Sequence, residues 1–400
     1  MNTYNEIHNP TFADFKLLRP SATLHFPHSI ECGSRWQTFG SSSGWTTDIA
    51  SSALGEHFER KHFYLDVPVH DTGTLDDGLT SQEYDDFIKA FSQTKNHRTR
   101  ADLASHVFDR TNVYRIVDFT RCKVPTACIS ISACLNPIDN HFYPMRDTCG
   151  CSAHISVERA LLGALKEAME RQFLLRFWLT NTCTEKIGHD ESCAMLLGRS
   201  CLSLFKELCK TGEICVLDLT DKRFPGSCIF LSYGNQNDNA KVKYCAGMAY
   251  AESLDKALEK SIVELWQTFR FMLSFDQANI GKTETLDPYI KHFLECNRYE
   301  TFGKTSSPTK LAALQHHKIQ PDTLSLSSLL PVVRRLEING YFYLASLPTK
   351  GPTLYFCKYL SPKLFLHMNN ASNFNLENTY SAPFLDQIIK NRLIEMVPFP

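Results

Sequence analysis

Carboxylates recur at a helical spacing among small and apolar residues in three stretches of the chain, 52–60, 163–171 and 260–268. In each stretch a second acidic or amide residue follows three places after a glutamate, which is Glu56, Glu167 or Glu264. Positions i, i+3 and i+4 share one face of a helix, so these polar side chains form a stripe. The pattern predicts three helices, covering 47–65, Ser156 to about Trp178, and about 253–273.

The second of these helices is apolar on nearly every other side, which is typical of a buried helix. Burying a carboxylate is costly unless something pairs with it, and a polyphosphate with its magnesium is such a partner. The alternative is a set of solvated faces with ion pairs one turn apart. Three copies on apolar helices favour pseudo-symmetric α/β units whose acidic helices converge on one cavity.

The rest of the chain predicts a mixed α/β (α+β) fold. Runs rich in Val, Ile and alternating small residues predict strands at 112–118, 126–134, 214–218, 227–232 and 242–250, and a pair at 341–346 and 354–359. A charged helix is expected to end near Lys95. Residues 1–45 are expected to be an irregular loop. We expect a single domain over 1–400, with an insertion at about 276–340 and a proline-containing tail at 396–400.

The composition and charge of the chain exclude several classes of function. The 400 residues carry a net charge of -1, so no overall basic field would attract nucleic acid. No apolar run approaches the roughly 20 residues that cross a bilayer, so no membrane association is expected. The polar N-terminus lacks a secretory pattern, and 15 irregularly spaced cysteines indicate reduced thiols in the cytoplasm. We interpret the one close pair, Cys149 and Cys151, as part of a turn rather than a zinc site.

Other short motifs in the chain give no comparable indication of function. The segments 281–283 and 303–305 both read Gly-Lys-Thr, like the end of a phosphate-binding loop. Asp276 and Arg298 stand where such a loop has its first glycine, so both segments are interpreted as ordinary loops. His316, His317 and His367 are interpreted as surface or packing residues.

Several motifs together resemble the YcaO family. They are Ser52-x-x-x-Glu56-x-x-Glu59-Arg60, the run from Gly150 to His154 that leads into the 164–171 segment, the helix with Glu264 and Gln267, and the proline-containing C-terminus. The resemblance implies the YcaO fold, which binds ATP without a kinase or P-loop architecture and holds Mg2+ with glutamates. The tail departs from the family pattern, because Pro398-x-Pro400 is shorter than the alternating prolines of many relatives.

The resemblance also implies roles for individual residues. The magnesium ligands would be Glu56, Glu59, Glu167, Glu170 and Glu264. The nucleotide would contact these glutamates and also Ser52, Arg60, Ser152, Arg171 and Gln267. Arg60 and Arg171 would either touch phosphate or hold the glutamates in place. The terminal carboxylate of Pro400 would act in catalysis, as positioning group or proton acceptor.

The implied activity is ATP-dependent cyclodehydration of a ribosomal precursor peptide. A Cys, Ser or Thr side chain attacks the preceding amide carbonyl, the oxyanion takes the γ-phosphoryl group of ATP, and loss of phosphate leaves a thiazoline or oxazoline. The implied partners are an E1-like leader-binding subunit and an FMN-dependent dehydrogenase. Two alternatives stay open: an external nucleophile giving a thioamide or amidine, and a non-catalytic scaffold subunit.

Overall fold

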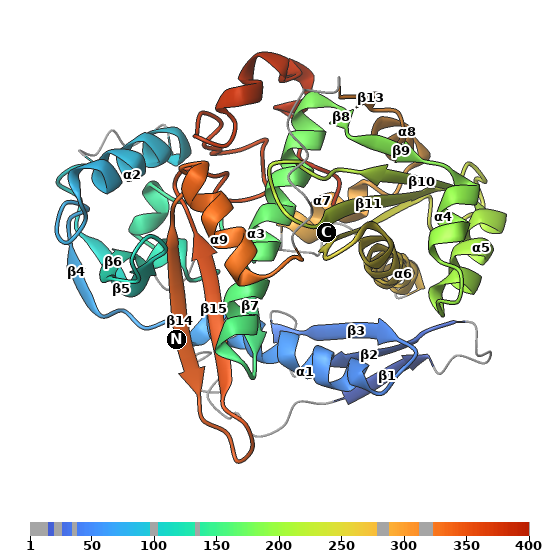
Figure 1. The fold of residues 1–400 in the computed structure, drawn as a ribbon, viewed down its shortest axis with the longest axis horizontal. Coiled ribbons are helices and arrows are strands. Elements are labelled where there is room, and N and C mark those ends of the chain that lie inside the picture. Colours follow the sequence, from blue (N-terminus) through green and yellow to red (C-terminus); the bar gives the residue numbers. More distant parts are fainter. Residues whose placement is uncertain are drawn as a thin grey trace.

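A long helix, α3 (Val157–Thr180), runs between three antiparallel β-sheets in a computed structural model of the chain (Figure 1). The structure describes residues 15–19, 26–33, 38–96, 103–132, 137–277, 288–311 and 323–399. No helix in these ranges has the length and hydropathy needed to cross a membrane.

The sheets are best described by strand order. The first sheet has the order β1 (Phe15–Arg19), β2 (His28–Cys32), β3 (Gly40–Gly44). The second has the order β12 (Tyr244–Ala251), β11 (Ser227–Gly234), β10 (Glu213–Asp218), β9 (Glu185–Ile187). The third has the order β4 (Asp71–Gly73), β5 (Phe108–Arg115), β14 (Tyr341–Leu347), β15 (Leu354–Leu360), β7 (Cys151–His154), with β6 (Arg121–Pro125) paired to β5. A short parallel pair joins β8 (Thr182–Cys183) and β13 (Thr309–Lys310).

Two further helices carry the other acidic stripes, α1 (Asp48–Lys61) and α6 (Leu254–Gln277). A single π-helical turn, His62–Asp66, extends α1 to the predicted end. The remaining helices are α2 (Ser81–Thr94), α4 (His189–Met195), α5 (Cys201–Thr211), α7 (Pro288–Glu295), α8 (Tyr299–Ser306) and α9 (Leu326–Arg335). The three acidic helices, α2 and the β14–β15 pair are therefore confirmed. Ser156 precedes α3 as predicted, although its side chain makes no capping hydrogen bond.

The prediction of a loop over residues 1–45 was wrong, because the described part of this segment forms the first sheet. The sequence of β3, Gly-Ser-Ser-Ser-Gly, lacks the β-branched and aromatic residues typical of strands. It pairs with β2 over its whole length, from Gly40 opposite Cys32 to Gly44 opposite His28. A Cβ at Gly40 would lie 2.1 Å from the Ala53 carbonyl oxygen on α1. The small residues are thus explained by the close approach of a helix.

Two other predictions need correction. The strand expected over 126–134 lies earlier, since β6 ends at Pro125 and a 3-10 turn follows at Thr126–Cys128. Proline lacks the N–H that would continue the ladder. The segment 303–305, expected as a loop, belongs to α8. The other Gly-Lys-Thr segment, 281–283, lies outside the described residues, as do His316 and His317.

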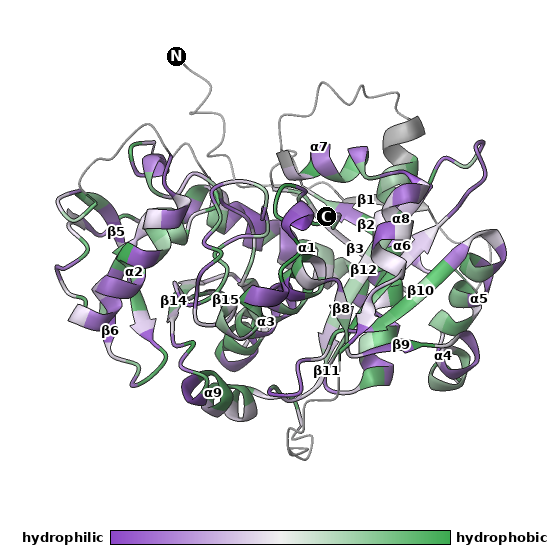
Figure 2. Cartoon of the chain, turned by 90° about the horizontal axis from the view of Figure 1, so that it is seen from above, coloured by the Kyte–Doolittle hydropathy of each residue, from purple (hydrophilic) through white to green (hydrophobic). Residues whose placement is uncertain are grey.

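The hydrophobic core has two parts. The larger surrounds α3 and includes strands β10 to β12, and β10 stands out as hydrophobic in Figure 2. The smaller lies under α2, whose outer face is polar, and includes Phe87, Phe91 and Phe108. Helix α3 is buried on most sides, as its sequence predicts.

Helices α7 to α9 lie in the region expected to be an insertion. Phe302 on α8 is buried against Gly234 of β11, and Leu329 and Val333 on α9 belong to the larger core. The region is therefore integrated into the fold, and its status as an insertion stays a prediction.

Candidate active site

The three acidic helices and three edge strands alternate around one centre. Helix α1 contacts β3 and β7, α3 contacts β7 and β12, and α6 contacts β12 and β3. Each of these three strands, β3, β7 and β12, lies at an edge of its sheet. An edge strand carries backbone N–H groups that no neighbouring strand accepts. All three sheets therefore direct free donors toward the helices that carry the glutamates.

The glutamates accept hydrogen bonds from these edge strands. The N–H of Ser41 on β3 donates to Glu56 Oε2 at 2.8 Å. On β12, the N–H of Tyr250 donates to Glu170 Oε2 at 2.7 Å, and that of Met248 donates to Glu264 Oε2 at 2.8 Å. The backbone of Ala153 on β7 hydrogen-bonds to Glu59. Hydrogen bonds to a carboxylate are among the stronger ones in proteins, so each side chain is held in one orientation.

Two arginines lie among the carboxylates. Arg60 Nη2 is 3.3 Å from Glu56 Oε1 on the same helix. Arg171 Nη2 is 3.7 Å from Glu167 Oε1, and its Nη1 is 3.6 Å from Glu170 Oε1. The field of Arg60 reaches Glu167 on α3, and that of Arg171 reaches Glu264 on α6. The predicted glutamates and arginines therefore form one electrostatic cluster, which we call the carboxylate cluster: Glu56, Glu59, Arg60, Glu167, Glu170, Arg171 and Glu264.

The pKa values of four of the glutamates are raised. Burial raises the pKa of Glu59 to about 7, with Arg60 lowering it and Glu56 raising it further. Burial and the neighbouring Glu170 raise the pKa of Glu264 to about 8. The pKa of Glu167 is raised well above its ordinary value and that of Glu170 is also raised, in both cases chiefly by burial. A partly buried site that gathers several carboxylates and raises their pKa values favours a bound cation.

The other predicted residues lie around this cluster. Ser52 is exposed one turn before Glu56, and its hydroxyl donates to the Asp48 carbonyl oxygen at 3.2 Å. Gln267 is half-buried, three residues after Glu264 on α6. Ser152 on β7 fills the space over Gly163, where an added Cβ would lie 2.3 Å from Ser152 Oγ. Pro400 lies outside the described residues.

Sequence reasoning missed a third cation near the cluster. Lys358 on β15 is only 5% exposed, its Nζ donates to the Asp147 carbonyl oxygen at 3.1 Å, and its charge lowers the pKa of Glu59. The signal was available, since Lys358 is the one charged residue in the apolar strand Leu354–Leu360. The backbone donors of the edge strands carried no such signal, because every residue except proline has an N–H.

The carboxylate cluster fits a magnesium ion shared with phosphate. In the described ranges no three His, Cys, Asp or Glu side chains stand close enough together to hold an ion by themselves. Magnesium is usually bound by one or two carboxylates, with phosphate oxygens and water completing its shell. Arg171 Nη1 and Arg60 Nε are buried and have no hydrogen-bond partner in the described part of the chain. Such donors suit phosphate oxygens.

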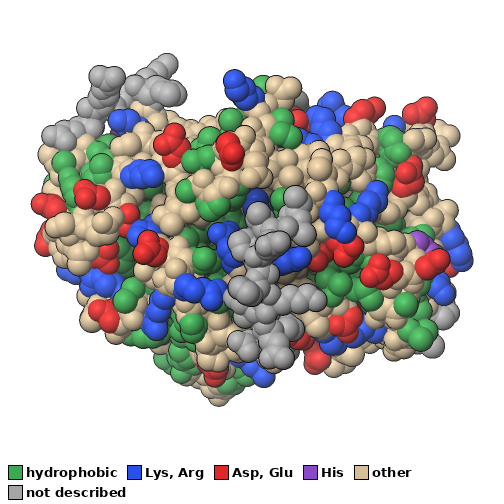
Figure 3. Space-filling model, turned by 45° about the horizontal axis from the view of Figure 1, so that its top comes forward, with side chains coloured by type: hydrophobic (Ala, Val, Ile, Leu, Met, Phe, Trp, Pro, Cys, Tyr) green, Lys and Arg blue, Asp and Glu red, His purple; other side chains and the backbone are tan. Residues whose placement is uncertain are grey.

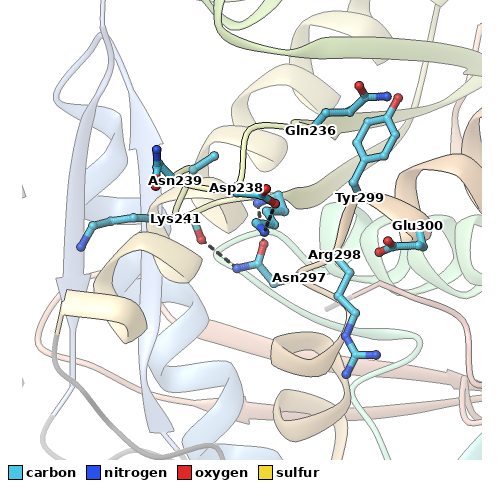
Figure 4. Close-up of a pocket in the computed structure, with 10 residues that line it drawn as sticks. Gln236, Asp238, Asn239, Lys241, Asn297, Arg298, Tyr299 and Glu300 are labelled. Atoms are coloured by element: carbon cyan, nitrogen blue, oxygen red, sulfur yellow. Dashed lines mark hydrogen bonds and ion pairs between the residues drawn. The ribbon is translucent and has the colours of Figure 1, made fainter.

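A groove of about 660 Å³ lies elsewhere, between the β11–β12 loop and the start of α8 (Figure 4). Asn297 closes one side of it, accepting from the N–H groups of Lys243 and Tyr244 and donating to the Lys241 carbonyl oxygen. Lys243 is 3.6 Å from Asp238, and Tyr299 donates to Glu213. These polar groups satisfy one another and none belongs to the carboxylate cluster, so we assign the groove no ligand.

Comparison with known proteins defines the class. Residues 46–364 match the family described as YcaO cyclodehydratase, ATP- and Mg2+-binding. The match covers most of the chain, and the chain belongs to the YcaO family of cyclodehydratases. It resembles a YcaO protein from Methanopyrus kandleri bound with AMPPCP and Mg2+ with a TM-score of 0.52 and 15% identity, over 90% of this chain and 88% of that one. At that identity the likeness shows the shared fold.

Within the family, the chain is similar to the Microcin B17-processing protein McbD of Escherichia coli. The two are 32% identical over 365 residues, which is 91% of this chain and 90% of McbD. The structure also matches a chain of the E. coli microcin synthetase McbBCD complex with pro-MccB17 bound. That match has a TM-score of 0.88 and 30% identity and covers 98% of each chain.

Proposed function

We propose that this chain catalyses ATP-dependent cyclodehydration of Cys, Ser or Thr residues in a ribosomal precursor peptide, giving thiazoline or oxazoline rings. The observation that carries the proposal is the carboxylate cluster, in which acidic side chains from three helices meet around two arginines. Membership of a cyclodehydratase family and the similarity to McbD over nine-tenths of both chains support the same activity.

In the proposed site each group has a distinct task. Glu56, Glu59, Glu167, Glu170 and Glu264 would hold Mg2+ together with the triphosphate. Bound Mg2+·ATP supplies the γ-phosphoryl group that makes the amide oxygen a good leaving group. The chain itself holds the reacting groups in place, and ring closure within one peptide gains from orientation. The edge-strand N–H groups fix the carboxylates before the nucleotide arrives, so little reorganisation is needed.

The arginines would act on the developing negative charge. Their unpartnered N–H groups point to phosphate contact, and their ion pairs at 3.3 to 3.7 Å point to holding the glutamates. Both tasks are compatible, because a guanidinium has five N–H donors. Ser52, Ser152 and Gln267 stay candidate nucleotide contacts, and the carboxylate of Pro400 stays the proposed positioning group or proton acceptor.

The proposed setting is a cytoplasmic multi-subunit synthetase. McbD occurs in the microcin synthetase McbBCD complex, which has been solved with pro-MccB17 bound. By analogy this chain would work with an E1-like subunit that binds the leader of the precursor and with an FMN-dependent dehydrogenase that oxidises the new rings. The cysteines in the described part of the chain are all free, as expected in a reducing compartment. The similarity to McbD favours this reading over an external nucleophile or a scaffold.

A single substitution tests the site. In Glu170→Gln the amide oxygen still accepts from Tyr250, but the negative charge is lost. We expect ring formation and ATP hydrolysis to fall about a hundred- to a thousandfold, the usual cost of removing one preorganised electrostatic group. Mass spectrometry counts the waters lost from the precursor, and size-exclusion chromatography shows whether the complex still assembles.

The matched control is Glu158→Gln, on an exposed position of the same helix. This variant should retain full activity. Complete dehydration of the precursor by Glu170→Gln would overturn the site assignment. A scaffold role would be indicated if the unsubstituted chain, with both partners and precursor, showed no ATP turnover.

A further inference from the structure

The segment 396–399 is buried and tied into the core at several points. The Tyr244 hydroxyl donates to the Pro398 carbonyl oxygen at 2.8 Å, and the Val397 N–H donates to Asn370 Oδ1 at 3.0 Å. Asn370 in turn donates to the Glu395 carbonyl oxygen at 3.0 Å, and so does Trp178 at 2.8 Å. These contacts come from β12, from the chain before the segment and from α3. They fix the course of the backbone up to Phe399.

The side chain of Phe399 contacts Arg171, a member of the carboxylate cluster. Its ring is completely buried and its centroid lies 4.9 Å from the guanidinium carbon of Arg171. The ring centroid of Phe230 on β11 is 6.2 Å from that of Phe399. A guanidinium within about 6 Å of a ring centroid is attracted by the ring's electron-rich face, and the attraction is larger where water is excluded. Phe399 therefore contacts Arg171 both sterically and electrostatically.

Arg171 has few other constraints on its orientation. Its two ion pairs, to Glu167 and Glu170, are 3.7 and 3.6 Å long, beyond good hydrogen-bond distance. Its Nη1 has no hydrogen-bond partner in the described part of the chain. A planar guanidinium held only by long ion pairs can rotate, whereas an aromatic ring in contact with it restricts that rotation. The aromatic face of Phe399, which lies under the Arg171 guanidinium, supplies that restriction.

We propose that Phe399 is a positioning residue that fixes the Arg171 guanidinium among Glu167, Glu170 and Glu264, so that it meets the bound triphosphate. The inference rests on the proposed nucleotide site and adds a residue that acts through Arg171. It also means that the segment 396–399 has a part in nucleotide binding that is separate from the terminal carboxylate.

Packing alone is the competing explanation, because Phe399 belongs to the larger hydrophobic core. The two explanations differ in what they require of the ring. Packing requires its volume, whereas positioning of a cation requires the electron density on its face. Ring fluorination lowers that electron density with little change of volume, so it distinguishes the packing explanation from the positioning explanation.

The test places phenylalanine analogues with progressively more ring fluorines at position 399 of the full-length chain. The same series at Phe87 is the control, because Phe87 is equally buried and its ring packs on Phe91 and Tyr341. Four quantities are measured: the dissociation constant for Mg2+·ATP, the KM for ATP, the kcat of ring formation in the complete complex, and the thermal unfolding midpoint.

We expect fluorination at 399 to weaken Mg2+·ATP binding stepwise, by about three- to thirtyfold across the series, as a partly desolvated cation–π contact allows. The KM for ATP should rise with it. The Phe87 series should leave both unchanged. A loss of folded enzyme would instead lower kcat at constant KM and lower the unfolding midpoint.

Equal binding of Mg2+·ATP across the 399 series would overturn the inference, as would equal losses at 399 and 87. The proposed function is judged separately on the unsubstituted chain. If that chain binds Mg2+·ATP but the complex forms no ring, the activity is wrong while the dissociation constants still decide the role of Phe399. If it binds no nucleotide, both proposals fall.

Discussion

At the scale of single residues, the site combines an excess of carboxylates over arginines with backbone hydrogen bonds that hold those carboxylates. Glu59 and Glu264 each accept a backbone hydrogen bond that favours the carboxylate, yet burial keeps their pKa values near 7 and 8. The same side chains would be expected near 4.5 in an unfolded chain. The unliganded protein therefore holds protons in its site that a bound cation would displace.

This predicts a pH dependence of stability. Because the folded state binds more protons than the unfolded state between about 4.5 and 8, these two groups stabilise the unliganded fold at low pH. Their contribution is lost as pH rises through the folded-state pKa values. We expect the unfolding midpoint to fall over that range, and Mg2+ with a nonhydrolysable ATP analogue to raise it most at pH 8.

Thermal unfolding of the wild-type chain and of Glu264→Gln checks this prediction. The variant lacks the titrating group, so its midpoint should depend less steeply on pH. A wild-type midpoint that rises with pH relative to the variant would contradict the assigned pKa direction.

At the scale of elements, glycines let the acidic helices reach their edge strands. A Cβ at Gly247 on β12 would lie 2.3 Å from both the Ser261 carbonyl oxygen and the Leu265 nitrogen on α6. Gly40 stands in the same relation to α1. The close approach is what brings the Met248 N–H within hydrogen-bond distance of Glu264. Side chains at these glycines would separate helix from strand.

Gly247→Ala should therefore lower both stability and activity. We expect a loss of about 1–3 kcal/mol in the free energy of unfolding, typical of overpacking against backbone, measured by urea denaturation. Nucleotide binding should weaken as well, because the Met248 donor moves away. The control is Gly303→Ala in α8, where an added Cβ meets nothing within 4 Å and should stabilise the helix by about 0.5–1 kcal/mol. Equal stability of Gly247→Ala and wild type would refute the packing argument.

The sequence located those helices and strands correctly whose conformation is set by a local pattern of residues. The acidic stripes located α1, α3 and α6, and the apolar runs at 214–218, 227–232 and 242–250 located β10, β11 and β12. It failed for β3, whose strand conformation depends on pairing with β2 and on the helix above it. Short glycine- and serine-rich segments have weak local preferences, so their partners decide.

At the scale of the whole molecule, charge is balanced. Lys and Arg total 42 against 43 for Asp and Glu, and the two signs are interspersed on the face seen in Figure 3. Protein–DNA affinity depends on neutralising many phosphates, which this arrangement does not favour. The cations Arg171 and Lys358 lie inside the fold, near Glu167 and the Asp147 carbonyl oxygen, and do not add to a basic surface.

We therefore expect no measurable binding of a 30-base-pair DNA duplex at physiological salt, that is, a dissociation constant above about 100 μM. Fluorescence anisotropy at several salt concentrations measures it. The precursor peptide in the presence of the partner subunits serves as the positive control. Micromolar binding to DNA with a steep salt dependence would contradict the prediction.

The amino-acid sequence alone determined which side chains carry charge on apolar helices and how far apart they stand along each helix, because helical periodicity is local. It could not determine that three sheets would end at the same centre, that backbone N–H groups would hold the carboxylates, or that Phe399 and Lys358 would reach them. Those relations join residues far apart in the chain, and only tertiary packing brings them within the few ångströms over which hydrogen bonds and ion pairs act.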